Sequence, residues 1–221
     1  MASAELDPDR KFVLDLVPEG RRPAVAALWR LDATLAAVLA GGREPHIARI
    51  KLAWWRDALE ALDHGRPPAE PVLQSVAGAL LPMGITGAEL ALMEEGWAVL
   101  LSDTALTSAD LALYAAARGG ILFRISASLL GREIAAEGER AGGAWALVDL
   151  ARHSNRIDAA AALAAARQRA GAGGRWPRQL RPLGMLAILA DRDSARGLDR
   201  LELPGTPPRI ARMLRHRLTG R

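Results

Sequence analysis

The sequence predicts an all-α protein folded as a bundle of about nine or ten helices. Apolar residues recur at the three- and four-residue spacing of amphipathic helices over most of the 221 residues, and the alternation typical of strands is missing over any useful length. Proline and glycine interrupt this pattern at intervals that suit helices joined by short connections. Residues 1–221 are therefore expected to form a single domain, with the basic part 170–221 packed on the same bundle.

Capping and breaking residues set the expected helix boundaries. Pro23 suits a first helical turn and Gly41 a helix end, whereas Thr86 with Glu89 has the pattern of a capping box. Thr107 or the serine after it begins a further helix. The expected helices cover residues 22–40, 45–64, 71–81, 86–101, 108–130, 133–152, 157–170, 182–190 and 208–218.

Two glycines, Gly119 and Gly120, fall in the middle of the helix expected over 108–130. Each costs about 1 kcal/mol relative to alanine inside a helix. The pair therefore predicts a kink or the close approach of another backbone. Residues 171–174 form a flexible break that we expect to be a loop within the domain.

Composition excludes several classes of site. The chain has no cysteine, which excludes disulfides, iron–sulfur clusters, zinc–thiolate sites and a cysteine nucleophile. Four scattered histidines do not favour a histidine-built metal site. Residues 1–15 lack the apolar core of a signal peptide, and the uncharged run 71–88 is too interrupted by proline and glycine to span a membrane. We expect a cytoplasmic protein, with peripheral contact at the inner membrane left open.

The net charge of +4 is unevenly distributed. Residues 172–221 contain 11 basic and 4 acidic residues, whereas residues 1–171 carry a net charge of −3. The last expected helix has an apolar stripe formed by Ile210, Met213, Leu214 and Leu218. We expect this stripe to dock on the bundle; alternatively, the basic amphipathic helix contacts a membrane surface or an acidic protein partner. Nucleic acid is not an expected partner, because the basic stripe occurs without a recognised nucleic-acid-binding module.

The best-marked segment is residues 44–59, EPHIARIKLAWWRDAL. Its apolar residues recur at helical spacing at Ile47, Ile50, Trp54 and Ala58. Trp54 and Trp55 are adjacent, so they lie on different sides of the helix and contact different neighbours. The two rings are expected to pack between helices; alternatively, one of them lines an apolar ligand cavity.

Two further segments are YAAARGG at 114–120 and GGAWALVDLAR at 142–152. The glycines that follow Tyr114 allow either tight helix packing or room for an isoprenoid-like chain. Asp149 and Arg152 lie three residues apart, so we expect them to pair on one helix face.

Together these segments resemble the squalene/phytoene synthase family. They occur in the family's order and approximate spacing over residues 11–156, and WWRDAL is the most specific of them. The resemblance implies an isoprenoid-synthase fold around a central apolar cavity. It also implies head-to-head condensation of two prenyl diphosphates, with magnesium held by two aspartate-rich helix motifs. The candidate substrate-binding residues are Asp32, Trp55, Tyr114, Asp149 and Arg152.

Both aspartate-rich motifs are altered in this sequence. The first pair of aspartates would fall at Ala36 and Ala40, and the aspartates of the second motif would fall at His153 and Ile157. Diphosphate departure needs Mg²⁺ held by carboxylates, which alanine and isoleucine do not provide. We therefore expect no cofactor and assign no catalytic residue, and we expect Mg²⁺ only if the chain is active.

The sequence favours a non-catalytic homologue that binds an isoprenoid or another lipid, or that acts in respiratory-complex assembly, as one member of this superfamily does. The first alternative is an active prenyltransferase of terpenoid or carotenoid biosynthesis that acts on prenyl diphosphates. Its metal ligands would come from Asp32, Glu94, Glu95, Asp103 and Asp149. The second alternative is a helical interaction protein without a ligand.

Overall fold

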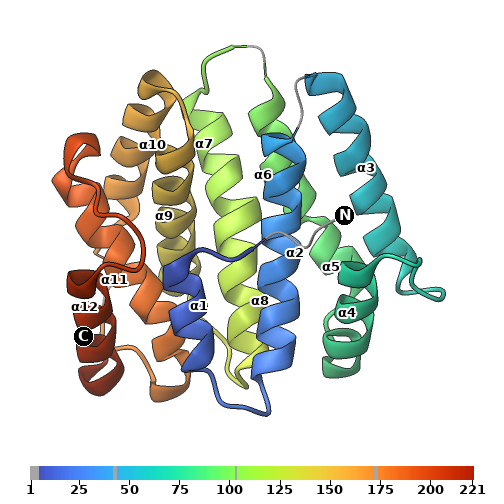
Figure 1. The fold of residues 1–221 in the computed structure, drawn as a ribbon, viewed down its shortest axis with the longest axis horizontal. Coiled ribbons are helices and arrows are strands. Elements are labelled where there is room, and N and C mark those ends of the chain that lie inside the picture. Colours follow the sequence, from blue (N-terminus) through green and yellow to red (C-terminus); the bar gives the residue numbers. More distant parts are fainter. Residues whose placement is uncertain (1–4, 42–43, 103, 172–173) are drawn as a thin grey trace.

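The computed structural model describes residues 5–41, 44–102, 104–171 and 174–221, and within these ranges the regular structure is helical throughout (Figure 1). The α-helices are α1 (Pro8–Asp15), α2 (Arg22–Ala40), α3 (Pro45–Ala61), α4 (Pro71–Ala79), α5 (Gly87–Ala91), α6 (Met93–Ala98), α7 (Ser108–Tyr114), α8 (Ile121–Leu129), α9 (Ala136–His153), α10 (Arg156–Arg169), α11 (Arg181–Arg196) and α12 (Pro207–Thr219). A π-helical segment, η3 (Ala115–Gly120), joins α7 to α8, and short 3₁₀ turns include η2 (Val99–Leu101) and η4 (Arg178–Leu180). The all-α prediction is therefore confirmed.

Most expected helices form where proline, glycine and capping residues place them. α2 has the expected bounds, and Thr86 and Thr107 are the N-cap residues of α5 and α7, each within a capping box. α11 extends beyond the expected 182–190 to Arg196, because Asp193 in its charged last turns faces the interior instead of ending the helix.

α1 is the helix that the sequence analysis missed. The Asp7 carboxylate accepts hydrogen bonds from the backbone N–H groups of Asp9 and Arg10, and Pro8 occupies the first helical position. This cap allows a short, charged helix to form without a long apolar stripe. α1 packs against α2, α11 and α12.

The core lies between α2, α9 and the helices around them. α9 packs against η3, α10 and α11, and α2 packs against α3, α4 and α8. The Trp29 indole of α2 donates a hydrogen bond to Ser126 of α8 at 3.0 Å, inside the core. In the described part of the chain α2 alone is long and apolar enough to cross a membrane, and 67% of its apolar window is buried inside the bundle.

The backbone of η3 touches that of α9. A Cβ atom at Gly119 would lie 2.2 Å from the Gly142 carbonyl oxygen, and a Cβ at Gly142 would lie 2.3 Å from the Gly119 carbonyl oxygen. The close approach expected from Gly119–Gly120 is therefore confirmed, and the helix accommodates it by widening to a π segment.

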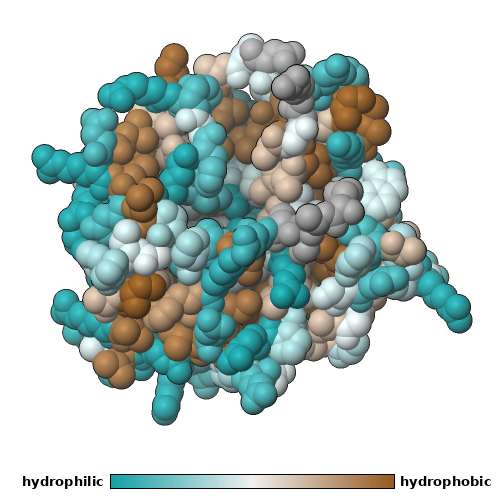
Figure 2. All heavy atoms as spheres, in the orientation of Figure 1, coloured by the Kyte–Doolittle hydropathy of each residue, from teal (hydrophilic) through white to brown (hydrophobic). Residues whose placement is uncertain are grey.

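The tryptophan pair of α3 is divided between core and solvent. Trp55 is 2% exposed, whereas Trp54 is 47% exposed, and the ring centroids meet edge to face at 5.3 Å. The expectation that they lie on different sides is confirmed, but packing of both rings between helices was wrong. Ile47 and Ile50 are also exposed, and apolar surface is visible over the first turns of α3 at the upper right of Figure 2.

The apolar stripe expected on α12 docks on the bundle only in part, with Ile210 half-buried against the core. Met213 is fully buried, but Leu214 and Leu218 face solvent, and Arg209 and His216 complete the buried side. The physical reason is the Arg209 guanidinium, which forms buried ion pairs with Asp9 of α1 and Asp193 of α11 and so fixes the rotation of the helix.

Gly119→Ala should destabilise the fold by several kcal/mol, because the added methyl group would overlap a backbone oxygen that cannot move independently of α9. Gly78→Ala in α4 is the matched control: nothing lies within 4 Å of its Cβ position, so helix propensity should stabilise the protein by up to about 1 kcal/mol. Urea unfolding of both variants measures the difference. A Gly119→Ala protein as stable as wild type would contradict the close contact.

Candidate functional site

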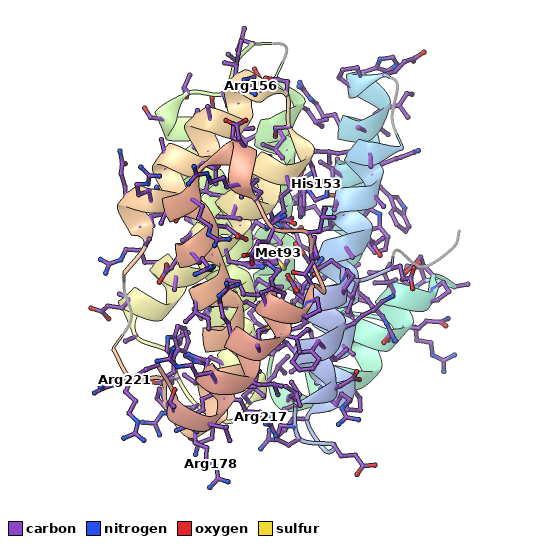
Figure 3. All side chains as sticks on the ribbon, turned by 60° about the vertical axis from the view of Figure 1, so that its left-hand side comes forward. Met93, His153, Arg156, Arg178, Arg217 and Arg221 are labelled. Atoms are coloured by element: carbon purple, nitrogen blue, oxygen red, sulfur yellow. The ribbon has the colours of Figure 1, made fainter. Side chains whose placement is uncertain are left out.

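A cavity of about 600 Å³ lies between α2, α6, α7, η3 and α9, close to the end of the bundle where α2 and α9 terminate. Its apolar wall comes mainly from α2 and from the segment that follows α6. That wall comprises Ala33, Ala36, Ala37, Leu39, Ala40, Trp97, Leu100 and Leu106. Its polar wall includes Asp7, Arg10, Tyr114, Arg118, Asp149 and His153. Figure 3 shows His153 in the upper half of the molecule, toward the end marked by Arg156.

Arg118 occupies the floor of this cavity and is 1% exposed. Its Nε and Nη2 donate to the two carboxylate oxygens of Asp32 at 2.9 and 3.0 Å, a bidentate pair. Its Nη1 donates to Asp149 Oδ2 at 2.6 Å and also to the Tyr114 hydroxyl. One guanidinium thus connects α2, η3, α7 and α9.

Arg10 of α1 completes the cluster from the other side. Its Nη1 donates to Asp32 Oδ2 at 2.7 Å, and its Nε donates to Asp7 Oδ2 at 2.8 Å. Asp32, which is fully buried, therefore accepts three hydrogen bonds from two arginines. We call Asp7, Arg10, Asp32, Arg118 and Asp149 the buried ion cluster.

Aromatic rings shield the buried ion cluster from water. The Arg118 guanidinium carbon lies 4.2 Å from the ring centroid of Trp97 and 5.0 Å from that of Trp145, and Arg10 lies 5.4 Å from Trp145. Trp97 also meets Tyr114 edge to face at 5.7 Å. These cation–π contacts offset part of the cost of burying two positive charges.

The cluster controls the protonation of its carboxylates. Burial alone would raise the pKa of Asp32, but the nearby Arg118 and Arg10 outweigh it and hold that pKa below its usual value. The pKa of Asp149 is lowered in the same way, since Arg118 and Arg10 together outweigh its burial. Burial raises the pKa of the Tyr114 hydroxyl well above its ordinary value. At neutral pH the carboxylates of Asp32 and Asp149 are therefore ionised, and the neighbouring Tyr114 phenol is neutral.

The residues around the cavity do not fit the magnesium sites that the family resemblance implies. Ala36, Ala40 and His153 line the cavity, whereas Ile157 is 75% exposed and is not part of its wall. Within the described ranges, no three His, Asp or Glu side chains come together in a way that could hold a metal ion. Oxygen-rich ligation by carboxylates is what Mg²⁺ requires.

The carboxylates considered as alternative ligands do not converge. Asp32 and Asp149 are held by arginines. Glu94 is buried, which raises its pKa, and the nearest counter-charge acting on it is Arg56 of α3. Glu95 is exposed, and Asp103 lies outside the described residues.

The structure brings together three of the five predicted site residues. Asp32, Tyr114 and Asp149 meet around Arg118, with Asp32 lying behind the guanidinium rather than on the cavity wall. Trp55 is buried on α3 and is not part of the wall.

Arg152 turns away from Asp149, so the expected pairing of these two residues was wrong. Arg152 donates to Asp193 Oδ2 at 2.6 Å and to the Glu202 carbonyl oxygen at 2.8 Å, beside a second cavity of about 450 Å³ between α9 and α11. Asp149 instead forms an ion pair with Arg118 of η3. A local spacing rule could not anticipate this competition between long-range partners.

Sequence reasoning missed Arg10, Arg118 and Trp97. One signal could have found Arg118: it is the single charged residue in the apolar, glycine-containing stretch AAARGG. A charged side chain inside a core helix needs a buried partner, so this stretch indicates a buried ion pair. Arg10 had no comparable signal, because the helix that positions it was not expected.

Arg118→Met should lower the free energy of unfolding by about 3–5 kcal/mol, because Asp32 and Asp149 would keep their charges and lose their shared partner. Arg118→Met/Asp32→Asn should lose less than the sum of the single variants, since the uncompensated carboxylate is gone. The control is Arg156→Met, which breaks an exposed pair with Asp199 and should cost less than about 1 kcal/mol. Equal losses for Arg118→Met and Arg156→Met in urea unfolding would refute the central role of the cluster.

Acid should weaken the fold through the same carboxylates. A carboxylate with a lowered pKa in the folded state contributes stability that is fully present above its unfolded pKa of about 4. That contribution is lost as the pH falls through the lower, folded pKa. Asp149→Asn should therefore flatten the fall of unfolding free energy below about pH 4. Urea titrations of the wild type and the variant across this range measure both slopes, and equal slopes would contradict this role of Asp149.

Comparison with known proteins identifies a family. The model of the family described as squalene/phytoene synthase matches residues 5–169, about three quarters of the chain. This match includes α1 to α10 and all residues of the buried ion cluster. Neither the curated proteins nor the solved structures contain a significant match. The chain therefore belongs to the squalene/phytoene synthase family.

Proposed function

We propose that this chain is a non-catalytic member of the squalene/phytoene synthase family that binds an uncharged isoprenoid or similar lipid chain in the cavity beside α2. The observation that carries the proposal is the chemistry of the cavity wall. Ala36 and Ala40 line it where the family resemblance places metal-binding aspartates, and Arg118 is paired with Asp149 on the wall and with Asp32 behind it.

The charge of the cavity floor argues against a diphosphate as the ligand. The buried ion cluster has three carboxylates and two guanidiniums, so its net charge is negative, and both arginines are already ion-paired. A diphosphate would compete with Asp32 and Asp149 for Arg118 without Mg²⁺ to compensate its charge. A neutral chain would not compete with these carboxylates for Arg118.

The size and lining of the cavity favour an apolar chain. A volume of about 600 Å³ lies within the usual range of small-molecule sites, and alanine and leucine side chains from α2 form much of the wall. Small side chains at 33, 36, 37 and 40 leave space along one face of α2 for an extended hydrocarbon. The Tyr114 hydroxyl and His153 provide polar groups for a hydroxyl head.

The alternatives predict different ligand requirements. An active prenyltransferase would need Mg²⁺ and prenyl diphosphates, and an assembly factor or interaction protein would need neither. Respiratory-complex assembly thus stays a separate prediction for a protein partner, and an isoprenoid ligand does not exclude it.

A thermal-shift titration with farnesol, geranylgeraniol and the two corresponding diphosphates, each with and without Mg²⁺, tests the proposal. We expect the alcohols to raise the melting temperature with or without Mg²⁺, because a ligand that binds the folded state stabilises it by RT ln(1 + [L]/Kd). A shift that requires both diphosphate and Mg²⁺ would instead support the prenyltransferase. No shift with any ligand would favour the interaction protein.

The matched pair of variants is Ala36→Phe and Ala164→Phe. Ala36 lines the cavity, so a phenyl ring there should fill it and abolish the shift by the alcohols. Ala164 is exposed on α10, outside this cavity, and its substitution should leave the shift unchanged. Loss of the shift in both variants would mean that the ligand effect does not come from the cavity.

A further inference from the structure

α12 turns its leucines away from the protein. Leu218 is 78% exposed and Leu214 is 43% exposed, and with Ala211 they follow one another along the solvent side of the helix. The opposite side, with Arg209, Met213 and His216, is buried. In an ordinary surface helix the apolar stripe faces the core.

This orientation is fixed by buried charges. The Arg209 Nε donates to Asp9 Oδ2 at 2.8 Å, and its Nη1 donates to Asp193 Oδ2 at 2.7 Å. Rotating α12 to bury its leucines would expose these carboxylates and break both ion pairs, which is costly for buried partners. The outward leucines are therefore a stable feature of the surface.

Arginines surround the outward leucines. The segment that precedes α11 lies against the end of α12: the Trp176 N–H donates to the Gly220 carbonyl oxygen at 2.9 Å, and Arg181 donates to the Arg217 carbonyl oxygen at 2.7 Å. The two leucines and the neighbouring arginines form what we call the cationic leucine face. Its members are Leu214, Leu218, Arg175, Arg178, Arg181, Arg215, Arg217 and Arg221.

Figure 3 places the labelled members Arg178, Arg217 and Arg221 together at the lower end of the molecule, opposite Arg156. In the part of the chain that the structure describes, none of the six arginines lies within 4.0 Å of a carboxylate. Acidic residues near the face are Asp191, which lines a small cavity together with Arg221, and Asp15, next in sequence to Leu16, whose carbonyl oxygen accepts a hydrogen bond from Arg217. The face therefore keeps a strong positive charge.

We propose that the cationic leucine face docks on the surface of a bilayer that contains anionic lipids. Arginines beside exposed leucines fit the interface, where the cations meet lipid phosphates and the leucines enter the acyl boundary. A nucleic acid or another soluble polyanion would use the arginines but would leave the leucines in water. The proposal is independent of the ligand in the cavity beside α2.

Sedimentation with vesicles of phosphatidylcholine, with or without phosphatidylglycerol, tests the docking surface on the full chain. We expect binding only to vesicles with phosphatidylglycerol. Arg178→Gln/Arg215→Gln/Arg221→Gln should weaken it by about 100-fold, at about 1 kcal/mol for each arginine near an anionic surface. The control is Arg30→Gln/Arg66→Gln/Arg200→Gln, which removes the same charge from exposed residues elsewhere and should weaken binding much less.

Substitution of the two leucines distinguishes docking on a bilayer from binding of a soluble polyanion. Leu214→Ala/Leu218→Ala should weaken vesicle binding by about tenfold or more, following the transfer energy of the methylene groups removed, without changing retention on heparin. Leu92→Ala/Leu113→Ala, at leucines of similar exposure to Leu214, should leave both unchanged. If the protein is retained on heparin and Leu214→Ala/Leu218→Ala binds vesicles as tightly as the wild type, the proposal is overturned in favour of a soluble polyanion.

A labelled protein provides a test that does not depend on destabilised variants. Because the chain has no cysteine, the Leu218→Cys variant can be labelled at this one position with an environment-sensitive fluorophore. The Arg200→Cys variant, labelled in the same way, is the control at an exposed position elsewhere. We expect a blue shift on phosphatidylglycerol vesicles for the label at 218 alone. An unshifted label at 218 on vesicles that bind the protein would show that another surface makes the contact.

Discussion

The Arg118 guanidinium, buried between Asp32 and Asp149, is the interaction on which the centre of this protein depends. From the π segment η3, it joins α2, which forms much of the cavity wall, to α9, which carries the GGAWALVDLAR segment. Arg118 and Asp32 are buried and Asp149 is 25% exposed, so removing any one of the three would leave a charged group largely out of water without one of its partners. The cavity beside α2 is consequently shaped by a fixed internal cation.

α1 connects this cluster to a second one. Arg10 and Asp7 belong to the buried ion cluster, while Asp9, between them in sequence, pairs with Arg209 of α12. A helix of only eight residues thus ties the family-matched part of the chain to the C-terminal helix that follows it. Its stability comes from these partners, because an isolated helix of this length is marginal in water.

The all-α class and most helix boundaries could be predicted because they depend on local chemistry. Pro23 and Gly41 delimit α2, and Thr86 and Thr107 cap α5 and α7, without reference to any distant residue. The close backbone contact between η3 and α9 was also predictable, although its partner was not. A glycine such as Gly119 destabilises the middle of a helix, so its presence there indicates a kink or a close approach of another backbone.

The site could be predicted only in part, because its decisive contacts are long-range. Asp32 and Asp149 were found through the family segments, but their partner Arg118 lies 86 residues from the first and 31 from the second. Arg152 and Arg209 both pair with Asp193 Oδ2, and this shared partner, which no helical spacing reveals, sets the direction of Arg152 and turns the leucines of α12 outward. Periodicity identifies a stripe; the buried charges decide which side of the helix faces the protein.

The internal cation also bears on what a divalent metal site beside α2 would require. Aspartates introduced at Ala36 and Ala40 would enter a cavity whose floor already carries a guanidinium, which repels Mg²⁺ and competes for the same carboxylates. Removing Arg118 first would leave Asp149 without its guanidinium partner and Asp32 with Arg10 alone, which would weaken the fold. Aspartates at positions 36 and 40 alone would therefore not recreate the metal site that the family resemblance implies.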